Sequence, residues 1–539
     1  MIPTITAAAL KARLQALGKA RKSGLVGEEL AIVDVRELAV FGDAHLFHGR
    51  SLPLSRLEAL AESLLPCRSV PIILCDGGEP DGQCAMIAAA RLVALGYEKL
   101  AVLEGGVAAW ASAGYEIFSG VNVPSKAFGE FVELRFGTPH ITADELNRRQ
   151  LDGDKMIILD SRPFDEFYDM SIPGGIDTPG AELVHRVFEV APDPDDLVVV
   201  NCAGRTRSII GAQSLINAGV PHRVAALKDG TMGWELAGLT LDHGQEQSAP
   251  PPGPDALEKA MSAAAAVRRR FNIPLLSSSD LAAWQEESQD RSLFLLDVRT
   301  QEEHQASHPE GFSWAPGGQL VQATDETIGP LGARVVLYDD QEVRAVMTAS
   351  WLVQMGWYDV AVWLGDNPSP FPASPSVKTA ALPQDGQTVS ALELRAILDS
   401  GEPAAVLDLA PSADYERGHI PGAAWALRGQ FEAMRPFLAG YGLIILTADD
   451  PLLIAPALSE VKPVVPQALL YGLEGGNASW RTAGLPLEAG MTWALCDRLD
   501  VWEKPYESES RMRDYLTWEV GLVDQVNRDG DAGFRWFDD

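Results

Sequence analysis

Seven consecutive residues after an apolar run, VVVN, have the types and the spacing needed for sulfur chemistry: Cys202, Ala203, Gly204, Arg205, Thr206, Arg207 and Ser208. A helical pattern, IIGAQSLINAG, follows them, so we expect a loop that leads from a strand into a helix. If this loop curls, as Gly204 permits, its backbone amides form an anion-sized cradle at the helix N-terminus. Arg205 and Arg207 add two positive charges, and Ser208 suits the N-cap position.

We expect the thiol of Cys202 to be the reactive group of this loop. At the floor of the cradle, the helix dipole and the arginines are predicted to lower its pKa and to favour the thiolate. A thiolate there can attack the outer sulfur of a sulfur-bearing anion, and a cysteine persulfide then remains on the protein. The alternative is a buried strand cysteine, the common fate of a free thiol. Two arginines within five residues weigh against an apolar core.

The strands and helices that must position this loop recur four times along the chain. In each copy an apolar strand ends in an aspartate, at Asp34, Asp160, Asp297 and Asp408. A second apolar strand, a helical stretch and a short third strand follow. Short β-branched strands that alternate with helices indicate a parallel sheet with helices on both faces. We therefore predict an α/β chain of four tandem domains, followed by a C-terminal helical tail.

Pro-rich segments mark the predicted boundaries. SAPPPGPDA at 248–256 divides the chain into two halves, and NPSPFPASPS at 367–376 separates the third copy from the fourth. The predicted parts are domain 1 (1–125, altered cysteine loop), domain 2 (126–245, catalytic), a linker (246–275), domain 3 (276–375, inactive), domain 4 (376–490, inactive) and a C-terminal extension (491–539). We expect the extension to form helices that pack back onto a neighbouring domain.

The composition limits the classes of partner. The 539 residues carry a formal net charge of −32, which disfavours nucleic acid and membrane surfaces. Five widely spaced cysteines argue against a disulfide framework and against a zinc site, and they fit a reducing compartment. The N-terminus reads as an amphipathic helix rather than a secretory signal, and no apolar run approaches the length of a membrane span. These features predict a cytoplasmic protein.

The Asp-x-Arg strands, the cysteine loop and the closing Gly-Gly…Trp turns resemble those of the rhodanese family, over about residues 5 to 490 and most closely over 140 to 240. The resemblance implies a rhodanese fold and transfer of sulfane sulfur, typically from thiosulfate to cyanide or a thiol, with no metal or organic cofactor. It makes Cys202 the persulfide-forming cysteine and residues 203–208 the substrate-binding loop, with Asp160 and Arg162 in support. The usual Gly-His after the first strand reads Met170-Ser171 here, which departs from the family pattern.

Loop length and charge narrow the reaction that this resemblance implies. Cys202 to Arg207 spans six residues, whereas related phosphatases with a cysteine nucleophile use a loop one residue longer. The mercaptopyruvate-specific branch tends to carry a neutral loop, and this one is dibasic. Thiosulfate or a related anionic donor is therefore favoured.

The third and fourth copies lack the nucleophile. Counting back from the glycine after each helix places Asp339 at the position of Cys202 in the third copy, and Arg344 at the position of Arg207. A carboxylate cannot carry sulfane sulfur. The fourth copy has Thr447-Ala448-Asp449-Asp450 in this place, without cysteine or arginine. We expect both copies to be inactive.

The first copy contains a possible second thiol site. Cys75 ends its second strand, and Cys84 falls at the position of Arg207 after an insertion of four residues. The loop between them has three carboxylates and no arginine, so we expect raised thiol pKa values there. The two thiols are either a redox or sulfur-relay pair or the incidental thiols of a decayed loop.

The sequence therefore predicts a sulfurtransferase with one working site at Cys202. Its expected partners are a small anionic sulfur donor and a cyanide or thiol acceptor, and a homodimer or a protein acceptor stays open. The alternatives are a non-catalytic sulfur-sensing scaffold and an anion-ester phosphatase. The choice of donor and acceptor depends on a cleft made by several loops.

Overall fold

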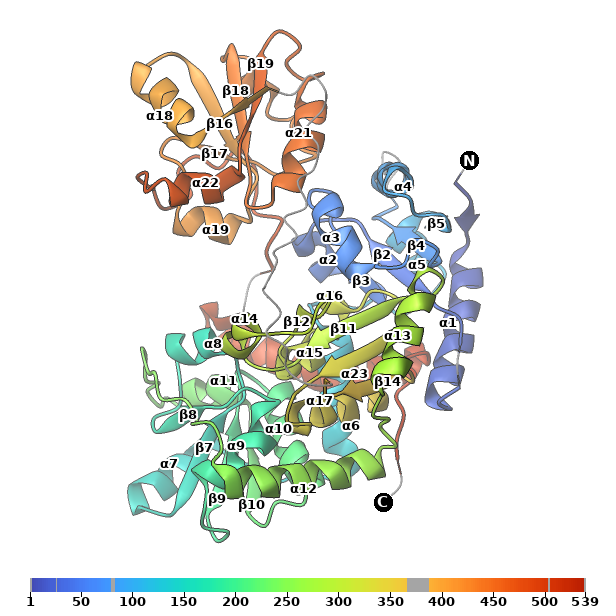
Figure 1. Cartoon of the computed structure of the whole chain (residues 1–539), viewed down its shortest axis with the longest axis vertical. Coiled ribbons are helices and arrows are strands. Elements are labelled where there is room, and N and C mark those ends of the chain that lie inside the picture. Colours follow the sequence, from blue (N-terminus) through green and yellow to red (C-terminus); the bar gives the residue numbers. More distant parts are fainter. Residues whose placement is uncertain (1, 26, 79–82, 366–386, 503–504, 538–539) are drawn as a thin grey trace.

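The computed structural model describes residues 2–25, 27–78, 83–365, 387–502 and 505–537, and contains four parallel β-sheets flanked by helices (Figure 1). We call these sheets with their helices units 1 to 4, at residues 4–112, 140–236, 278–363 and 387–482. The prediction of an α/β chain with four tandem sheets is confirmed. The Pro-rich segment at 367–376 and the boundary predicted at 375–376 lie outside the described residues. Among the helices of the described ranges, none combines the length and apolar character needed to cross a membrane.

Units 1 and 2 share one topology, with their strands in the orders β1-β5-β4-β2-β3 and β6-β10-β9-β7-β8. Unit 1 contains β1 (Thr4–Ile5), α1 (Ala7–Lys22), β2 (Ala31–Asp34), α2 (Leu38–Asp43), β3 (Gly49–Ser51), α3 (Leu57–Leu64), β4 (Ile72–Cys75), α4 (Cys84–Ala94), β5 (Leu100–Leu103) and α5 (Gly106–Ser112). Unit 2 contains β6 (His140–Ile141), α7 (Ala143–Asp152), β7 (Met156–Asp160), α8 (Phe164–Asp169), β8 (Gly175–Asp177), α9 (Glu182–Val190), β9 (Leu197–Asn201), α10 (Thr206–Asn217), β10 (Arg223–Leu227) and α11 (Gly230–Leu236).

Unit 4 repeats this strand order, whereas the sheet of unit 3 has four strands in the order β12-β11-β13-β14. Unit 3 contains α13 (Ser278–Glu286), η1 (Glu287–Gln289), β11 (Leu293–Asp297), α14 (Gln301–Ala306), β12 (Ser313–Trp314), α15 (Gly317–Gln322), α16 (Thr324–Thr327), β13 (Arg334–Tyr338), α17 (Val343–Gln354) and β14 (Val360–Trp363). Unit 4 contains β15 (Gln387–Val389), α18 (Ala391–Ser400), β16 (Ala404–Asp408), α19 (Ser412–Arg417), β17 (Ala424–Trp425), α20 (Arg435–Leu438), β18 (Leu443–Thr447), η2 (Pro451–Leu453), α21 (Ile454–Val461), β19 (Leu469–Leu473) and α22 (Gly476–Thr482).

Four further elements lie between or after the units: α6 (Val123–Phe136), α12 (Pro254–Arg270), η3 (Pro505–Glu507) and α23 (Glu509–Asp529). Helix α12 occupies most of the segment predicted as a linker and packs against α9 of unit 2 and α17 of unit 3. Helix α23 packs against α6 beside unit 2, as expected of a tail that returns to a neighbouring domain (Figure 1).

One large hydrophobic cluster joins units 2 and 3. It contains Leu183 of unit 2, Val335 of unit 3, Phe128 of α6, Ala264 of α12 and Leu522 of α23, all fully or almost fully buried. Strands buried on both sides need apolar residues throughout, which is why the runs IILD and VVVN contain so few polar residues. Unit 2 therefore shares its core with unit 3 and the tail.

Unit 4 stands apart from this body and is joined to unit 1 by charged groups (Figure 1). Its apolar core is built from the unit itself and from the segment that follows it, which contributes Met491, Leu495 and Leu499; Ala59 of α3 packs on it from unit 1. The buried guanidinium of Arg428 donates to Glu460 at 2.7 Å and to Glu58 of α3 at 2.8 Å. Arg91 of α4 donates to the same Glu460 carboxylate at 2.5 Å.

Candidate active site

Cys202 is the first residue beyond the central strand β9 of unit 2. The pairing of β7 with β9 sets Asp160 opposite Asn201, so the next residue lies just past the end of the sheet. Helix α10 begins four residues later, at Thr206. The loop therefore lies at the carboxyl end of the sheet and at a helix N-terminus, the place where doubly wound folds bind ligands.

The sulfur of Cys202 is buried, and the residue is only 2% exposed. Burial raises the pKa of its thiol, and the nearby carboxylate of Glu519 also raises it, whereas Arg207 and the amide and hydroxyl of Ser208 lower it. The net shift is upward. The predicted lowering of this pKa is therefore wrong, because the sequence could not show how completely the loop is shielded from water.

The backbone of the loop keeps amide donors available. Among the described residues, no acceptor takes the amides of residues 203–205. The loop is held from its carbonyl side, since the oxygens of Cys202 and the next residue accept from the amides of Thr231 (2.9 Å) and Met232 (3.1 Å). Gly230, at φ +57°, permits this close approach, because a Cβ there would lie 2.3 Å from the carbonyl oxygen of Cys202.

Arg205 fastens the loop to its surroundings. Its Nε donates to Glu130 at 2.7 Å, and the guanidinium also pairs with Glu133 and with Asp229, the latter at 3.2 Å. The two glutamates lie on α6, and Asp229 precedes α11. The charge of Arg205 is thus balanced by carboxylates, and its main effect is to hold the loop against α6.

Arg207 lies at the junction of units 2 and 3. Its Nη2 donates to Glu166 at 2.8 Å, and its Nη1 donates to the side-chain oxygen of Gln319 of unit 3 at 3.3 Å. Its charge is one of the influences that lower the pKa of Cys202. Of the two arginines predicted to bind an anion, Arg207 therefore faces fewer carboxylates and acts on the sulfur.

Asp160 and Arg162 form a buried pair beneath the loop. The Nε and Nη2 atoms of Arg162 donate to the two carboxylate oxygens of Asp160, both at 2.8 Å. Asn201 also donates to Asp160, at 2.7 Å, and Arg162 reaches the carbonyl oxygen of Met170 at 2.6 Å. The pair thus ties together the ends of β7 and β9. The departure at Met170-Ser171 leaves this backbone contact in place.

The C-terminal helix α23 covers the loop. A Cβ on Gly204 would lie 3.2 Å from Oε2 of Glu519 and 3.6 Å from the ring of Tyr515. The hydroxyl of Thr206 donates to Oε1 of Glu519 at 3.4 Å. The sequence reasoning singled out none of these tail residues. The only available signal was their spacing, since residues three and four apart share one face of a helix.

Lys126 of α6 is buried beside this helix among aromatic rings. Its ammonium nitrogen lies 5.2 Å from the rings of Tyr515 and Trp518 and 5.7 Å from that of Trp502. Burial lowers the pKa of Lys126 to about 8. The cover of the loop thus contains a cation, a carboxylate and three aromatic rings, all missed by motif analysis.

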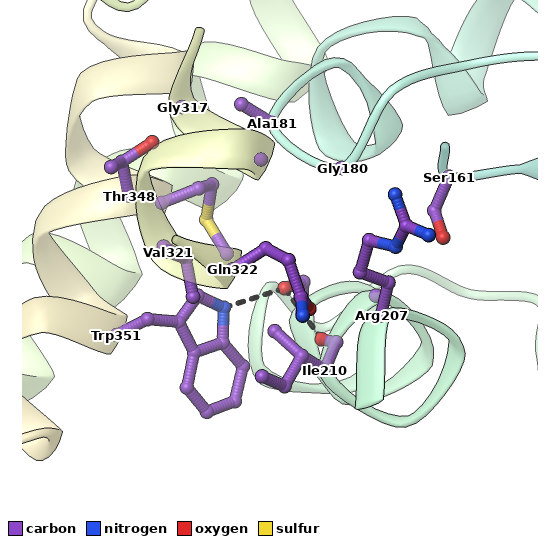
Figure 2. A pocket seen from close by; sticks show the side chains of 14 residues that line it. Ser161, Gly180, Ala181, Arg207, Ile210, Gly317, Val321, Gln322, Thr348 and Trp351 are labelled. Carbon is purple, nitrogen blue, oxygen red and sulfur yellow. Dashed lines mark hydrogen bonds between the residues drawn. The ribbon is translucent and has the colours of Figure 1, made fainter. Parts of the chain in front are cut away.

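A cavity of about 30 Å³ lies beside Arg207, between units 2 and 3 (Figure 2). Gly180 lines it from unit 2 and Trp351 from unit 3, and the Trp351 indole donates to the hydroxyl of Ser214 at 2.7 Å. A larger cavity of about 410 Å³ shares Ser161 and Gly180 with it. Two neighbouring cavities therefore lie at the interface of units 2 and 3, and the smaller one is lined by Arg207.

Unit 3 has its own carboxylate where unit 2 has the thiol. Asp297 pairs with Tyr338, so Asp339 is equivalent to Cys202. Its Oδ2 accepts from the amides of Arg344 (2.7 Å) and Ala345 (3.3 Å), and the Arg344 guanidinium donates to Oδ1 at 2.9 Å. Burial raises the pKa of Asp339, but Arg344 lowers it further, so the net shift is downward. In unit 3 the donors of this loop therefore bind a carboxylate of the protein itself, that of Asp339.

In unit 1 an aspartate, rather than Cys75, lies at the position of Cys202, although Cys75 does end the strand as predicted. Asp34 lies opposite Cys75 in the sheet, so Asp76, not Cys75, is equivalent to Cys202. Asp76 accepts from the amides of Gly78 (3.0 Å) and Ala85 (3.1 Å), and it fills this loop as Asp339 fills the other. Counting from the helix could not resolve this position, because the loop has a different length.

The two cysteines of the unit 1 loop, Cys75 and Cys84, lie in unlike environments. Cys75 is buried in the apolar core and contacts the carbonyl oxygen of Val33 at 3.5 Å, whereas Cys84 begins α4 with an exposed side chain. Burial raises the pKa of both thiols, well above the usual value for Cys75. Neither the shielded Cys75 nor the acidic surroundings of Cys84 favour a reactive thiolate.

Unit 4 has neither thiol nor carboxylate at this position. Asp408 pairs with Thr447, so Ala448 is equivalent to Cys202. Asn477 donates to Asp408 at 2.9 Å, where the other units use an Asp-x-Arg pair. Across the described residues, no group of three or more His, Cys, Asp and Glu side chains is arranged to hold a metal ion.

Comparison with known proteins gives a consistent result. The model of the Rhodanese-like domain family matches residues 13–113 and 142–237. The crystal structure of a thiosulfate sulfurtransferase from Pseudomonas aeruginosa is similar over 100% of both chains, with 44% identity and a TM-score of 0.91. The HTH-type transcriptional regulator Rv0324 of Mycobacterium tuberculosis is 36% identical over 110 residues, which are 20% of this chain and 47% of that protein. The match thus spans about half the length of this curated relative.

Proposed function

This chain belongs to the rhodanese family, and from that premise we propose that it transfers sulfane sulfur from an anionic donor such as thiosulfate through a persulfide on Cys202. The family and the enzyme class were both predicted from the sequence, and both are confirmed. The similar protein from Pseudomonas aeruginosa is described as a thiosulfate sulfurtransferase, which supports thiosulfate as the donor.

The observation that carries the proposal is the difference between equivalent loops. In units 1 and 3, amides at the helix N-terminus bind the carboxylates of Asp76 and Asp339. These loops thus bind an oxyanion in the position that Cys202 holds in unit 2. Unit 2 has a sulfur there instead, with Arg207 close enough to act on it, so an external anion can use the donors that remain.

The proposed reaction has two halves. The Cys202 thiolate attacks the outer sulfur of thiosulfate, the sulfur–sulfur bond of the donor breaks, and sulfite leaves with the electron pair. The amides of residues 203–205 and the guanidinium of Arg207 stabilise the departing anion. An acceptor, cyanide or a thiolate, then attacks the sulfane sulfur and releases Cys202 as a thiolate.

We propose that Cys202 is the only persulfide-forming site and that units 1, 3 and 4 shape access to it or bind partners. The predicted division into domains at 125, 245, 275, 375 and 490 also stays a proposal. The free cysteines of the described chain support a reducing, cytoplasmic setting.

The test is turnover of thiosulfate and cyanide, followed by thiocyanate formation and by the mass of the loaded protein. Cys202→Ala is expected to abolish both thiocyanate formation and the added sulfur. Cys75→Ala, a matched thiol deletion in unit 1, is expected to leave both unchanged. Undiminished thiocyanate from Cys202→Ala would refute the site. Absence of added sulfur on the wild-type protein would support the scaffold alternative instead.

A further inference from the structure

The carboxylate of Glu519 has one satisfied and one unsatisfied oxygen. Oε1 accepts from the hydroxyls of Tyr515 (3.1 Å) and Thr206 (3.4 Å). Oε2 is buried and has no hydrogen-bond partner among the described residues. Since burying a carboxylate oxygen without a partner is costly, such an oxygen calls for a function.

This free oxygen is directed at the cysteine loop. Oε2 lies 3.2 Å from the point where a Cβ on Gly204 would be. The charge of Glu519 also raises the pKa of the Cys202 thiol. Glu519 itself is only 2% exposed. A buried, unpartnered oxygen thus lies over the middle of the loop that surrounds the sulfur.

The surroundings of Glu519 hold it between its charged and neutral forms. Burial raises its pKa to about 7, Lys126 and Arg205 lower it, Glu130 raises it, and the hydrogen bond from Tyr515 lowers it. A group that is partly ionised at neutral pH can both take up and release a proton.

We infer that Glu519 is the proton acceptor for a thiol substrate that takes the sulfane sulfur from Cys202. This inference rests on the proposed function and deepens it, since it names the acceptor class as a neutral thiol and places the C-terminal helix in the active site. A thiol needs a base there, because only its deprotonated form attacks sulfur.

The step balances without any further reactant. The acceptor R–SH gives its proton to Oε2 of Glu519, and the electron pair of its sulfur forms a bond to the sulfane sulfur. The bond between that sulfur and Sγ of Cys202 breaks, and its electron pair stays on Cys202 as a thiolate. The products are R–S–S–H, after the proton returns, and the free enzyme.

Proton uptake by Glu519 also assists the leaving group. As a carboxylate, Glu519 raises the pKa of Cys202 and thus disfavours the thiolate. Once Glu519 is protonated, this repulsion is gone at the moment when Cys202 departs as an anion. Protonation of Glu519 therefore favours release of the Cys202 thiolate, and both changes occur as the sulfur is transferred to the acceptor.

The test separates the two half-reactions of the full-length protein. The enzyme is loaded with thiosulfate while sulfite release is measured, and the persulfide is then discharged with cysteine, whose thiol pKa is about 8.5. Glu519→Gln is expected to load no more slowly than wild type but to discharge about 100-fold more slowly, the usual scale of general-base catalysis. With an acidic aromatic thiol, already a thiolate at neutral pH, this deficit is expected to disappear.

The pH profile gives a second readout that a structural role would not change. In wild type, the rate of discharge by cysteine is expected to rise as the pH increases through the Glu519 pKa. Glu519→Gln is expected to lose this rising limb of the pH profile. Tyr515→Phe keeps the carboxylate but removes a bond that stabilises it, so the limb is expected to move to higher pH. This variant carries the test if Glu519→Gln does not fold. Glu509→Gln, on the exposed first turn of the same helix, is the matched control and is expected to behave as wild type.

Equal discharge rates and equal pH profiles for Glu519→Gln and wild type would overturn the inference and leave the proposed function standing. Loss of loading together with discharge would also overturn it, because Glu519 would then only support the loop. If the wild-type protein never acquires sulfur on Cys202, the proposed function itself fails. The outcomes are therefore distinct.

Discussion

The loops of units 2 and 3 have the same position and opposite contents. Both follow a central strand and enter a helix, and both have an arginine at the equivalent place, Arg207 and Arg344. In unit 3 that arginine turns inward and binds Asp339, whereas in unit 2 it pairs with Glu166 and Gln319 at the edge of the loop. The loop of unit 3 thus has acceptors of its own for its donors, whereas the loop of unit 2 has not.

This difference concerns the hydrogen-bond donors that each loop leaves available. The carboxylate of Asp339 accepts hydrogen bonds from three backbone amides and a guanidinium, so the loop needs nothing from outside. The Cys202 thiol is a poor acceptor, and it leaves neighbouring amides available for a substrate. The loop of unit 2 therefore has fewer internal hydrogen bonds than that of unit 3, and its amides stay available to bind an anion.

The largest expected effect comes from copying unit 3 into unit 2. Cys202→Asp is expected to reduce thiocyanate formation by at least about a thousandfold, the scale seen when a nucleophile is removed. The chain is expected to stay folded, because the new carboxylate can accept the amides of the loop. Thermal unfolding and thiosulfate–cyanide turnover check this on the same preparation. A destabilised protein would mean that the two cradles are not alike.

The next effect is on stability and comes from breaking the buried pair of unit 3. Arg344→Met leaves the Asp339 carboxylate buried without its cation and is expected to lower the free energy of unfolding by about 3–5 kcal/mol. Removing the carboxylate as well, in Asp339→Asn with Arg344→Met, is expected to recover part of this loss. Denaturant unfolding of the single and double variants measures the coupling. Arg148→Met, at an exposed ion pair, is the control and is expected to change little.

The smallest effect concerns Ser208, whose equivalents in units 1 and 3 are Ala85 and Ala345. The Ser208 hydroxyl donates to the carbonyl oxygen of Arg205 at 2.8 Å and also lowers the pKa of the Cys202 thiol. Ser208→Ala removes this influence, so the pKa of Cys202 is expected to rise and less thiolate to be present at neutral pH.

Loading of the Ser208→Ala variant by thiosulfate is therefore expected to slow a few-fold at pH 7, since one pKa unit changes the thiolate fraction about tenfold. The alkaline limb of the loading rate is expected to move to higher pH, as sulfite release at several pH values would show. Unchanged loading across the range would mean that the amide of Ser208 alone supports the sulfur.

Local sequence carried much of the fold and part of the site. The apolar strands ending at Asp34, Asp160, Asp297 and Asp408 could be found because a buried strand needs a continuous apolar run. Cys202 and Arg207 could be proposed together as site residues because the loop that joins strand to helix is contiguous in sequence. The position of Asp339 in unit 3 followed from the same count, since the length of its loop matches that of unit 2.

The rest depended on packing between distant segments. The pKa of Cys202 was predicted in the wrong direction, since the helix that covers the loop lies some three hundred residues further along the chain. The equivalence of Asp76 with Cys202 came from strand register, which an inserted loop hides. Lys126 and Glu519 belong to no recognisable motif, and only the contact of α6 with α23 brings them to the site.

The reach of α23 back to the loop has a consequence for biosynthesis. Thr206 and Glu519 are 313 positions apart, so a ribosome completes unit 2 long before it makes the helix that covers it. Domains fold in order as they emerge during translation. The strands and the cysteine loop of unit 2 are therefore synthesised before the helix that covers Cys202 exists. A chain whose translation halts after unit 4 lacks α23, so its Cys202 loop stays exposed to water until the last residues are made.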